Sequence, residues 1–278
     1  MQIQVRSQRA GQDYFDRISC KEFSSTLEVP SGQNPAQNAW LTITINYSFV
    51  FVDQRTPSGI ALRQGDQWVA KDSDGKVFPL RDWDRESMSD FVKRFQAGQD
   101  FWNYKFLLIT PKTYDKLDFT SQSGMGFVCR PNVICLLRLV SGGTPEHLAI
   151  KVVRLNQNAP NNFRSESRLY ESRDVGDKTL WHELGHSLDQ LHIRALLGDA
   201  NCLVDINAGP CYVTPSFMPP NIMGLGSNLG FINAKPWREL IAEHTKLSQS
   251  AWSVSMSVNQ PPRKIPIGVQ MVAPVTEF

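Results

Sequence analysis

The amino-acid sequence predicts an α+β fold in which strands and helices succeed one another along the chain. Residues 41–51 alternate apolar and polar side chains, as a half-buried strand does. Phe91, Val92 and Phe95 recur at the spacing of a helix. With 278 residues and 41% hydrophobic content, the chain is long enough to bury a full core, as one large domain or two small ones.

The expected elements follow in a regular order. Leu41–Phe51 lies in a β-rich amino-terminal region. A hairpin is expected next, in which the Asp72–Gly75 turn joins the strands Trp68–Ala70 and Lys76–Phe78. A helix is predicted over Ser89–Gln99, with Gly98 near its end. Three further strands precede a polar loop at 156–162; they are predicted at 106–110, 132–140 and 148–155.

Charge and hydropathy exclude some classes of partner. The net charge is +2 and no basic run is present, so the sequence shows no electrostatic footprint for nucleic acid or for an anionic membrane. The longest apolar stretches, such as residues 106–109 and 133–137, are far shorter than the roughly 20 residues that span a bilayer. We therefore expect no membrane-spanning helix.

The segment from His182 to His192 carries three of the five histidines of the chain. His182 and His186 are four residues apart and project from one face of a helix, where both ring nitrogens can reach one metal ion. Glu183 follows the first histidine, so its carboxylate lies beside the metal, where it can take a proton from a polarised water. This spacing predicts a catalytic zinc site, with Glu183 as the general base.

A third ligand is expected at His192, provided that the chain turns back after the helix. Taken together, His182, Glu183, His186 and His192 resemble the HExxHxxGxxH signature of the metzincin zinc endopeptidases. The glycine of that signature is replaced by Asp189 in this chain. Asp tolerates the left-handed conformation better than most residues, so the turn stays possible.

A second segment supports the resemblance. Asn221–Gly224 resembles the Met-turn that lies beneath the metal in metzincins, with Met223 as its methionine. Some metzincins carry a tyrosine two residues after this methionine, a place that Leu225 takes here, and Tyr212 is a candidate for the same role. An ordinary buried methionine is the alternative for Met223.

Two other interpretations of the motif stay open. In gluzincins the third ligand is a glutamate on a later helix, and Glu239 and Glu243 lie on such a predicted helix at 237–244, opened by Pro236. Alternatively, the histidines belong to a solvated helix and bind nothing.

The resemblance implies a zincin or metzincin-like catalytic domain with a mixed twisted sheet, an active-site helix and a smaller lower subdomain. We expect this domain at residues 84–250. Residues 1–83 are expected to form a β-rich region packed on it, and residues 251–278 an extended tail. Cys202 and Cys211 are a candidate disulfide pair, as are Cys129 and Cys135, with free thiols as the alternative.

The function that follows from these expectations is a zinc-dependent endopeptidase acting on a protein or peptide. The alternatives are a zinc amidase acting on peptidoglycan peptides and a non-catalytic zinc-containing binding or toxin module. Residues 221–237 also resemble metallopeptidase effectors of the type VI secretion system, which implies an immunity or inhibitor protein as a partner. Residues 1–10 lack the apolar core of a secretory signal. We therefore expect secretion, or delivery to a recipient periplasm, without a cleavable signal, with a cytoplasmic location as the alternative.

Overall fold

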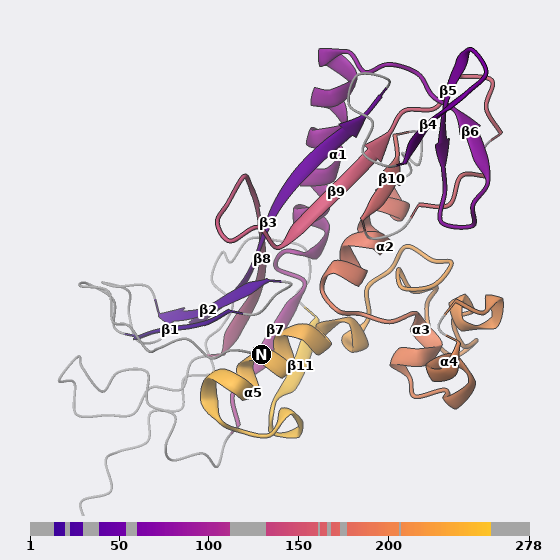
Figure 1. Ribbon diagram of the computed structural model, residues 1–278. Helices are drawn as coiled ribbons and strands as arrows, with labels where there is room; N and C mark the ends of the chain where they lie inside the picture. The colour runs from indigo at the N-terminus through magenta and orange to yellow at the C-terminus, as the bar shows by residue number, and fades with distance from the viewer. Residues whose placement is uncertain are drawn as a thin grey trace, which may run out of the picture. The chain divides into compact units, whose positions relative to one another are not determined.

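The computed structural model of the chain divides into two compact units (Figure 1). It describes residues 14–19, 23–29, 39–53, 60–111, 132–160, 162–165, 168–172, 177–205 and 207–256. Unit 1 comprises Met1–Thr44, Trp102–Arg138 and Leu229–Phe278, and unit 2 comprises Ile45–Phe101 and Leu139–Asn228. The expected division into residues 1–83, 84–250 and 251–278 stays a prediction.

The described residues of unit 1 include antiparallel strands and an 11-residue helix. Strand β1 (Tyr14–Ser19) pairs with β2 (Ser24–Val29), which pairs with the first residues of β3 (Ala39–Val52). Strand β7 (Phe106–Ile109) pairs with β8 (Val133–Ser141) and β11 (Ser253–Met256).

Helix α5 (Lys235–Thr245) also belongs to unit 1. It begins near Pro236, as the sequence predicts, and its Trp237 indole donates to the carbonyl of Leu136.

Unit 2 continues β3 beyond Thr44. Residues 47–52 of β3 pair in parallel with β9 (Leu148–Val153), and β9 pairs in parallel with β10 (Leu169–Glu171). Helix α1 (Arg85–Trp102) packs its aromatic face on this sheet, where Phe91 and Phe95 contact the rings of Phe49 and Tyr170. The α+β prediction is therefore confirmed, with parallel and antiparallel pairs in one mixed sheet.

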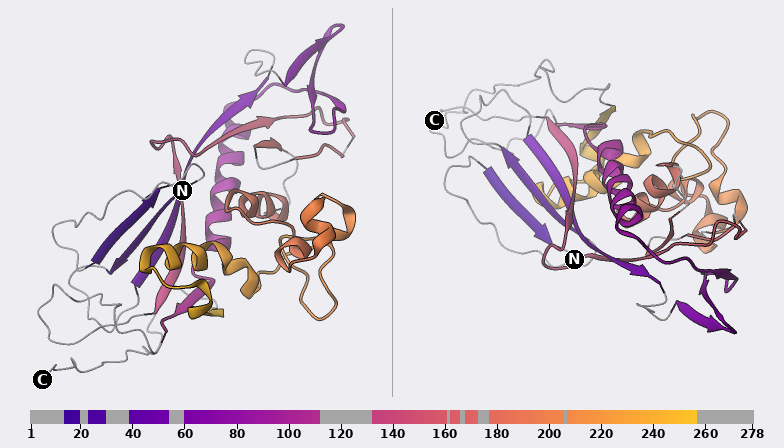
Figure 2. Two further views of the ribbon diagram at one scale, coloured as in Figure 1. Left: turned by 60° about the horizontal axis from the view of Figure 1, so that its bottom comes forward. Right: turned by 90° about the horizontal axis from the view of Figure 1, so that it is seen from above.

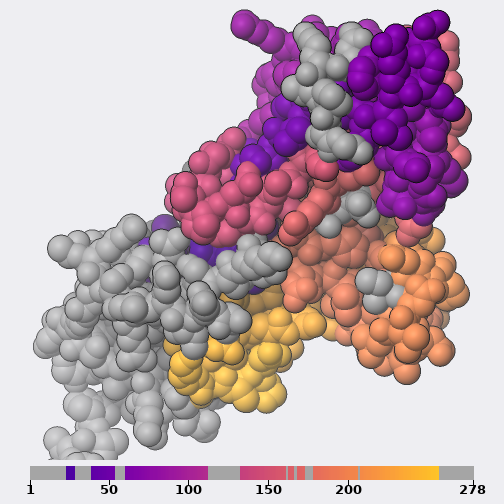
Figure 3. Space-filling view, in the orientation of Figure 1, coloured from indigo at the N-terminus to yellow at the C-terminus, as the bar shows by residue number. Residues whose placement is uncertain are grey.

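A small antiparallel sheet of β4 (Ala61–Gln64), β5 (Gln67–Lys71) and β6 (Val77–Pro79) also belongs to unit 2. Its atoms are the dark purple ones at the upper right of Figure 3. The predicted β5–β6 hairpin is confirmed. Gly75 in its turn has a φ of +81°, a conformation that favours glycine. Phe78 of β6 contacts Phe163, which ties the loop at 162–165 to the hairpin.

Helix α2 (Asp177–Ser187) carries the histidine motif and lies against α1 in both views of Figure 2. The Trp181 ring stacks on Phe101 with ring centroids 4.1 Å apart. Gly98 faces Leu184, and a Cβ at this position would lie 3.1 Å from that side chain. The sequence predicted Gly98 near the end of α1, but the helix continues to Trp102. Gly98 does not end the helix; because it has no side chain, it allows α2 to pack closely against α1.

The remaining predicted strands at 106–110, 132–140 and 148–155 correspond to β7, β8 and β9 within one or two residues. Short helices complete the described chain; they are α3 (Ile193–Leu196), α4 (Ala200–Val204), η1 (Gly209–Tyr212), η2 (Phe231–Ala234) and η3 (Gln249–Ala251). Among the described residues, no helix is both long and apolar enough to cross a membrane. The expected tail beyond residue 256 lies outside the described residues.

The close approach of α1 and α2 gives a test of this packing. Gly98→Leu should lower the free energy of unfolding by about 1–3 kcal/mol, because the added side chain overlaps Leu184 and Trp181. Ala97→Leu, at the exposed neighbouring position of the same helix, is the matched control and should change it by less than about 0.5 kcal/mol. Urea unfolding measures both. Equal stability of the two variants would show that the helices do not meet at Gly98.

Candidate metal centre

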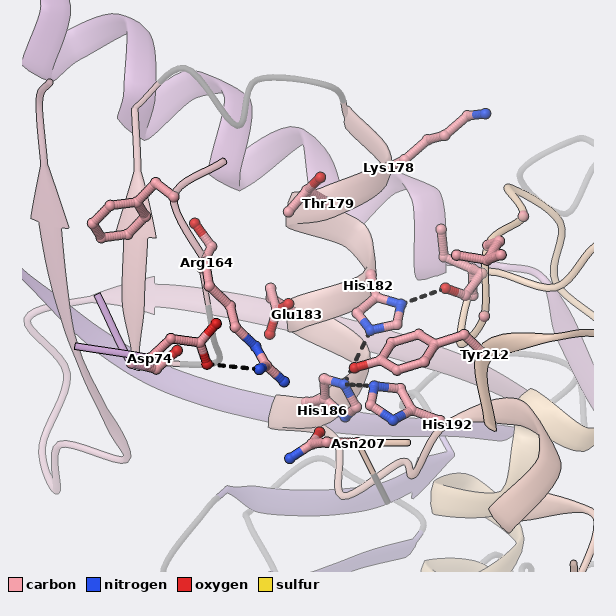
Figure 4. Close-up of a pocket in the computed structure, with 17 residues that line it drawn as sticks. Asp74, Arg164, Lys178, Thr179, His182, Glu183, His186, His192, Asn207 and Tyr212 are labelled. Atoms are coloured by element: carbon pink, nitrogen blue, oxygen red, sulfur yellow. Dashed lines mark hydrogen bonds and ion pairs between the residues drawn. The ribbon is translucent and has the colours of Figure 1, made fainter. Parts of the chain in front are cut away.

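Three histidine side chains converge in unit 2 (Figure 4). The Nε2 atom of His186 lies 3.1 Å from Nε2 of His182 and 3.1 Å from Nε2 of His192. Tetrahedral ligands that are each 2.0–2.1 Å from one ion stand roughly 3.3 Å apart. The three nitrogens therefore have nearly the spacing that a shared metal ion requires, and His192 completes the group as the sequence predicts.

His182 and His186 lie on the last turns of α2, and a tight turn brings His192 back to them. The amide of Asp189 donates to the carbonyl of His186, and that of Gln190 donates to the carbonyl of Gly185. These two bonds form the Schellman motif, which needs a left-handed residue just after the helix. Asp189 has a φ of +60°. The prediction that aspartate can adopt the left-handed conformation at this position is therefore confirmed.

Two backbone carbonyls fix which ring nitrogen faces the centre. Nδ1 of His182 lies 2.6 Å from the carbonyl oxygen of Ile222, and Nδ1 of His186 lies 2.7 Å from that of Gln190. A carbonyl oxygen only accepts, so both Nδ1 atoms carry the proton and donate it. The Nε2 atoms then present lone pairs, and this donor arrangement is typical of metal-bound histidines.

Burial keeps these imidazoles in the neutral form that binds metals. It is the main cause that lowers the pKa of His182, and it lowers the pKa of His186 to about 4, with the neighbouring His182 as the next cause. The Nε2 atoms of the three histidines lie close enough together to share one ion, so the cluster can hold a metal ion.

The segment Asn221–Gly226 lies directly behind the histidines. The amides of Gly224 and Gly226 both donate to the carbonyl of Asn221, and the amide of Met223 donates to its side chain. Besides the Ile222 contact with His182, the carbonyl of Met223 accepts from the amide of Ile193, next to His192. Met223 is fully buried. The predicted Met-turn segment is thus in contact with both parts of the histidine motif.

Tyr212 lies against the histidine cluster. Its ring centroid is 3.8 Å from that of His192, and it lines the same pocket. The amide of Leu225 donates to the carbonyl of Tyr212, and a Cβ added at Gly224 would overlap that carbonyl oxygen. Gly224 therefore permits the close approach of the two segments. Leu225, in contrast, is 78% exposed.

The segment before Tyr212 is closed by a disulfide. Cys202 and Cys211 form this bond, as one of the sequence alternatives predicts, and their side chains pack with Ala195. Cys135 is a buried free thiol, whereas Cys20 and Cys129 lie outside the described residues. The disulfide ties the middle of α4 to η1, and so fixes the position of Tyr212 at the end of η1.

Glu183 faces the same pocket as the three histidines (Figure 4). It lies on α2 beside His182 and is 7% exposed. Tyr170 of β10 is fully buried close by, and burial, followed by the nearby Glu183 carboxylate, raises the pKa of the Tyr170 hydroxyl well above its ordinary value. Because Glu183 lines the pocket together with the three histidines, the carboxylate predicted as general base can reach the space in front of them.

Sequence reasoning missed one wall of this pocket. Ser73 and Asp74 of the β5–β6 turn and residues 163–165 line it together with the motif residues. Asp74 is 90 residues from Arg164, with which it forms an ion pair of 2.8 Å. No local pattern relates the two segments, so their meeting could not be predicted.

The two glutamates of the alternative ligand set have other partners. Glu239 is paired with Lys235 and Glu243 with Lys246, both at 3.7 Å, on the half-exposed surface of α5. Within the described part of the chain, the group able to hold a metal contains His192 and neither glutamate.

Comparisons with protein-family models, with curated proteins and with solved structures find no match to the chain. The resemblance to metzincins therefore depends on residues 182–192 and 221–224 and stays a prediction. What the site can do chemically follows from its own residues and their geometry.

Metal content after ligand substitution tests the centre. Loss of any one imidazole leaves two ligands, so His182→Ala and His192→Ala should each bind a divalent ion at least about tenfold more weakly. Glu239→Gln and Glu243→Gln each remove one of the two alternative ligands and should keep wild-type binding. Dialysis against Zn²⁺ followed by elemental analysis gives the stoichiometry. Full metal content in His192→Ala, with loss in either glutamate variant, would reverse the assignment.

The turn at Asp189 gives a second test. Asp189→Val should lower the free energy of unfolding by about 1–2 kcal/mol, because a β-branched residue is poorly tolerated at positive φ. Asp189→Gly should be within about 1 kcal/mol of the wild type. Asp189→Asn is the matched control, since Asn also adopts this conformation. Urea unfolding of the metal-free proteins separates these effects from metal binding, and a Val variant as stable as the Asn variant contradicts the expectation.

Proposed function

We propose that this chain is a zinc-dependent endopeptidase with a metzincin-like site. The observation that carries the proposal is the convergence of three imidazoles, His182, His186 and His192, on one point beside the Glu183 carboxylate. When bound, zinc polarises the scissile carbonyl and lowers the pKa of the attacking water towards about 7. Three protein ligands leave one tetrahedral position open, which is the arrangement of catalytic rather than structural zinc sites.

Zinc is the metal that this donor set favours. Imidazole nitrogens suit zinc, copper, iron and nickel, whereas magnesium and calcium prefer oxygen ligands. The Nε2 separations of 3.1 Å fit the small tetrahedral ion. The carbonyls of Ile222 and Gln190 orient two of the three rings, so the ligands are positioned before the metal arrives.

Glu183 acts as the general base. It follows His182 on α2, and its carboxylate reaches the pocket from a buried position. It takes the proton of the attacking water as the new bond forms at the scissile carbonyl carbon. It then delivers this proton to the leaving amine. A single carboxylate thus serves first as base and then as acid.

Tyr212 is placed to stabilise the developing charge. Its ring packs on His192 and its hydroxyl lies in the pocket beside the proposed metal position. Burial is the main cause that raises the pKa of Tyr212, so the hydroxyl keeps its proton at neutral pH and can donate it in a hydrogen bond to the carbonyl oxygen of the substrate.

Substitution of the base tests the function. We expect new protein amino termini when the zinc-loaded wild type is incubated with a bacterial periplasmic extract, detected by mass spectrometry. Glu183→Gln should form them at least about 100-fold more slowly, because proton transfer is lost while zinc stays bound. Glu243→Gln removes a carboxylate from α5 and is the matched control, with wild-type activity expected.

The zinc content of each protein must be measured alongside. Cleavage by zinc-loaded Glu183→Gln at the wild-type rate would refute the mechanism. If no new termini form in any sample, the same proteins are incubated with purified peptidoglycan. Glu183-dependent release of its peptides would assign the activity to the amidase instead.

A further inference from the structure

The pocket wall that sequence reasoning missed carries an arginine directed at the candidate centre. Figure 4 shows Asp74 and Arg164 on one side of the three histidines, with the Arg164 side chain extending towards them, and the Tyr212 ring beside the histidines with its hydroxyl directed into the same space. The Tyr212 hydroxyl and the Arg164 guanidinium are close enough for each to shift the pKa of the other. The guanidinium therefore lies within the space that a substrate must enter.

The β5–β6 turn holds Arg164 in this position. The buried Asp72 side chain accepts from the backbone amides of Lys76 and Arg164 and so joins the turn to the loop. The Asp74 carboxylate accepts from Nη1 of Arg164 at 2.8 Å. This hydrogen bond is the main cause that raises the pKa of the Arg164 guanidinium, which is charged at every relevant pH. The side chain is thus oriented before substrate binds.

The charged residues that line the pocket are Asp74, Arg164, Lys178 and Glu183, and their formal charges sum to zero. Asp74 also interacts with Lys76 at 3.5 Å, so its negative charge is shared between two cations. The Arg164 guanidinium is therefore only partly neutralised by Asp74.

We propose that Arg164 is a specificity-determining residue that selects peptides with a carboxylate-bearing side chain beside the cleaved bond. This inference rests on the proposed peptidase function. A guanidinium has five N–H donors; the ion pair with Asp74 uses one of them, and the nearby Tyr212 hydroxyl can accept from another. The side chains of Arg164 and Asp74 are 44% and 36% exposed, so a carboxylate entering the pocket can reach the remaining donors and bind in the bidentate manner.

A purely structural ion pair predicts something different. If Arg164 only joined the loop to the hairpin, its removal would weaken the binding of all peptides alike. If it recognises a carboxylate, its removal weakens the binding of acidic peptides alone. The difference in binding between acidic and other peptides, rather than the overall strength of binding, therefore distinguishes carboxylate recognition from a purely structural role.

The experiment uses four pools of fluorescent octapeptides. Each pool has one fixed central residue, Glu, Gln, Lys or Leu, and equimolar mixtures at the other positions. Fluorescence anisotropy measures their binding to the zinc-loaded Glu183→Ala protein, which leaves the peptides intact. We expect the Glu pool to bind about tenfold more tightly than the Gln pool, as charge-assisted hydrogen bonds exceed neutral ones.

Three further substitutions in the same background complete the test. Arg164→Gln should abolish the preference for Glu over Gln, and Arg164→Glu should turn it into a preference for the Lys pool. Lys93→Gln removes the same charge from the exposed face of α1, outside the pocket, and should keep the full preference. Thermal melts confirm that each variant is folded. Equal binding of the Glu and Gln pools by Glu183→Ala, or a preference that survives Arg164→Gln, overturns the inference.

Cleavage of the same pools by the protein with Glu183 intact separates the two proposals. Glu183-dependent cleavage without preference for the Glu pool leaves the peptidase and removes the role of Arg164. Tight, Arg164-dependent binding of the Glu pool without any cleavage leaves carboxylate recognition and removes the peptidase.

Discussion

The site depends on the orientation of its imidazoles, whose Nε2 atoms converge on one point. The carbonyls of Ile222 and Gln190 take the Nδ1 protons of His182 and His186, and so direct the unprotonated nitrogens at each other. Burial favours the neutral form of these two rings, which is the form that binds a metal ion. An ion bound between them and Nε2 of His192 would form three bonds to the protein. Metal binding should therefore stabilise the fold of unit 2 as well as complete its chemistry.

The loop at Asn221–Gly226 joins the parts of this site. Its backbone contacts the ring of His182, the residue after His192 and the carbonyl of Tyr212. Gly224 makes the last of these contacts possible because any side chain would displace Tyr212. The disulfide fixes the other end of the same wall. The metal ligands and the proposed oxyanion donor are therefore held by one network of backbone hydrogen bonds rather than by mobile side chains.

Local patterns were sufficient for the parts of the site that lie close in sequence. The i,i+4 spacing of His182 and His186 placed both on one helical face, and the alternation in residues 41–51 identified β3. The helix predicted over Ser89–Gln99 is too short at both ends. At its start, the pattern did not reveal that the Asp84 side chain accepts from the amide of Ser87 and so caps the helix. At its end, the sequence indicated termination near Gly98, whereas this residue lies in contact with α2.

Short strands and the second pocket wall escaped prediction for a different reason. β10 has three residues, too few for a periodic signal, and is defined only by its pairing with β9. Likewise, nothing near Arg164 indicates that its amide and guanidinium will bond to Asp72 and Asp74. Such contacts depend on the packing of segments about 90 residues apart, which composition and spacing do not encode.

The left-handed backbone of Asp189 has a consequence for recognising related sites. The turn after α2 requires a φ near +60°, and glycine is only the commonest residue that supplies it. A consensus string that insists on glycine would reject this chain although its three imidazoles converge. A pattern that admits glycine, asparagine or aspartate at this place would describe the backbone conformation itself, and would find proteins in which the residue has changed and the geometry has not.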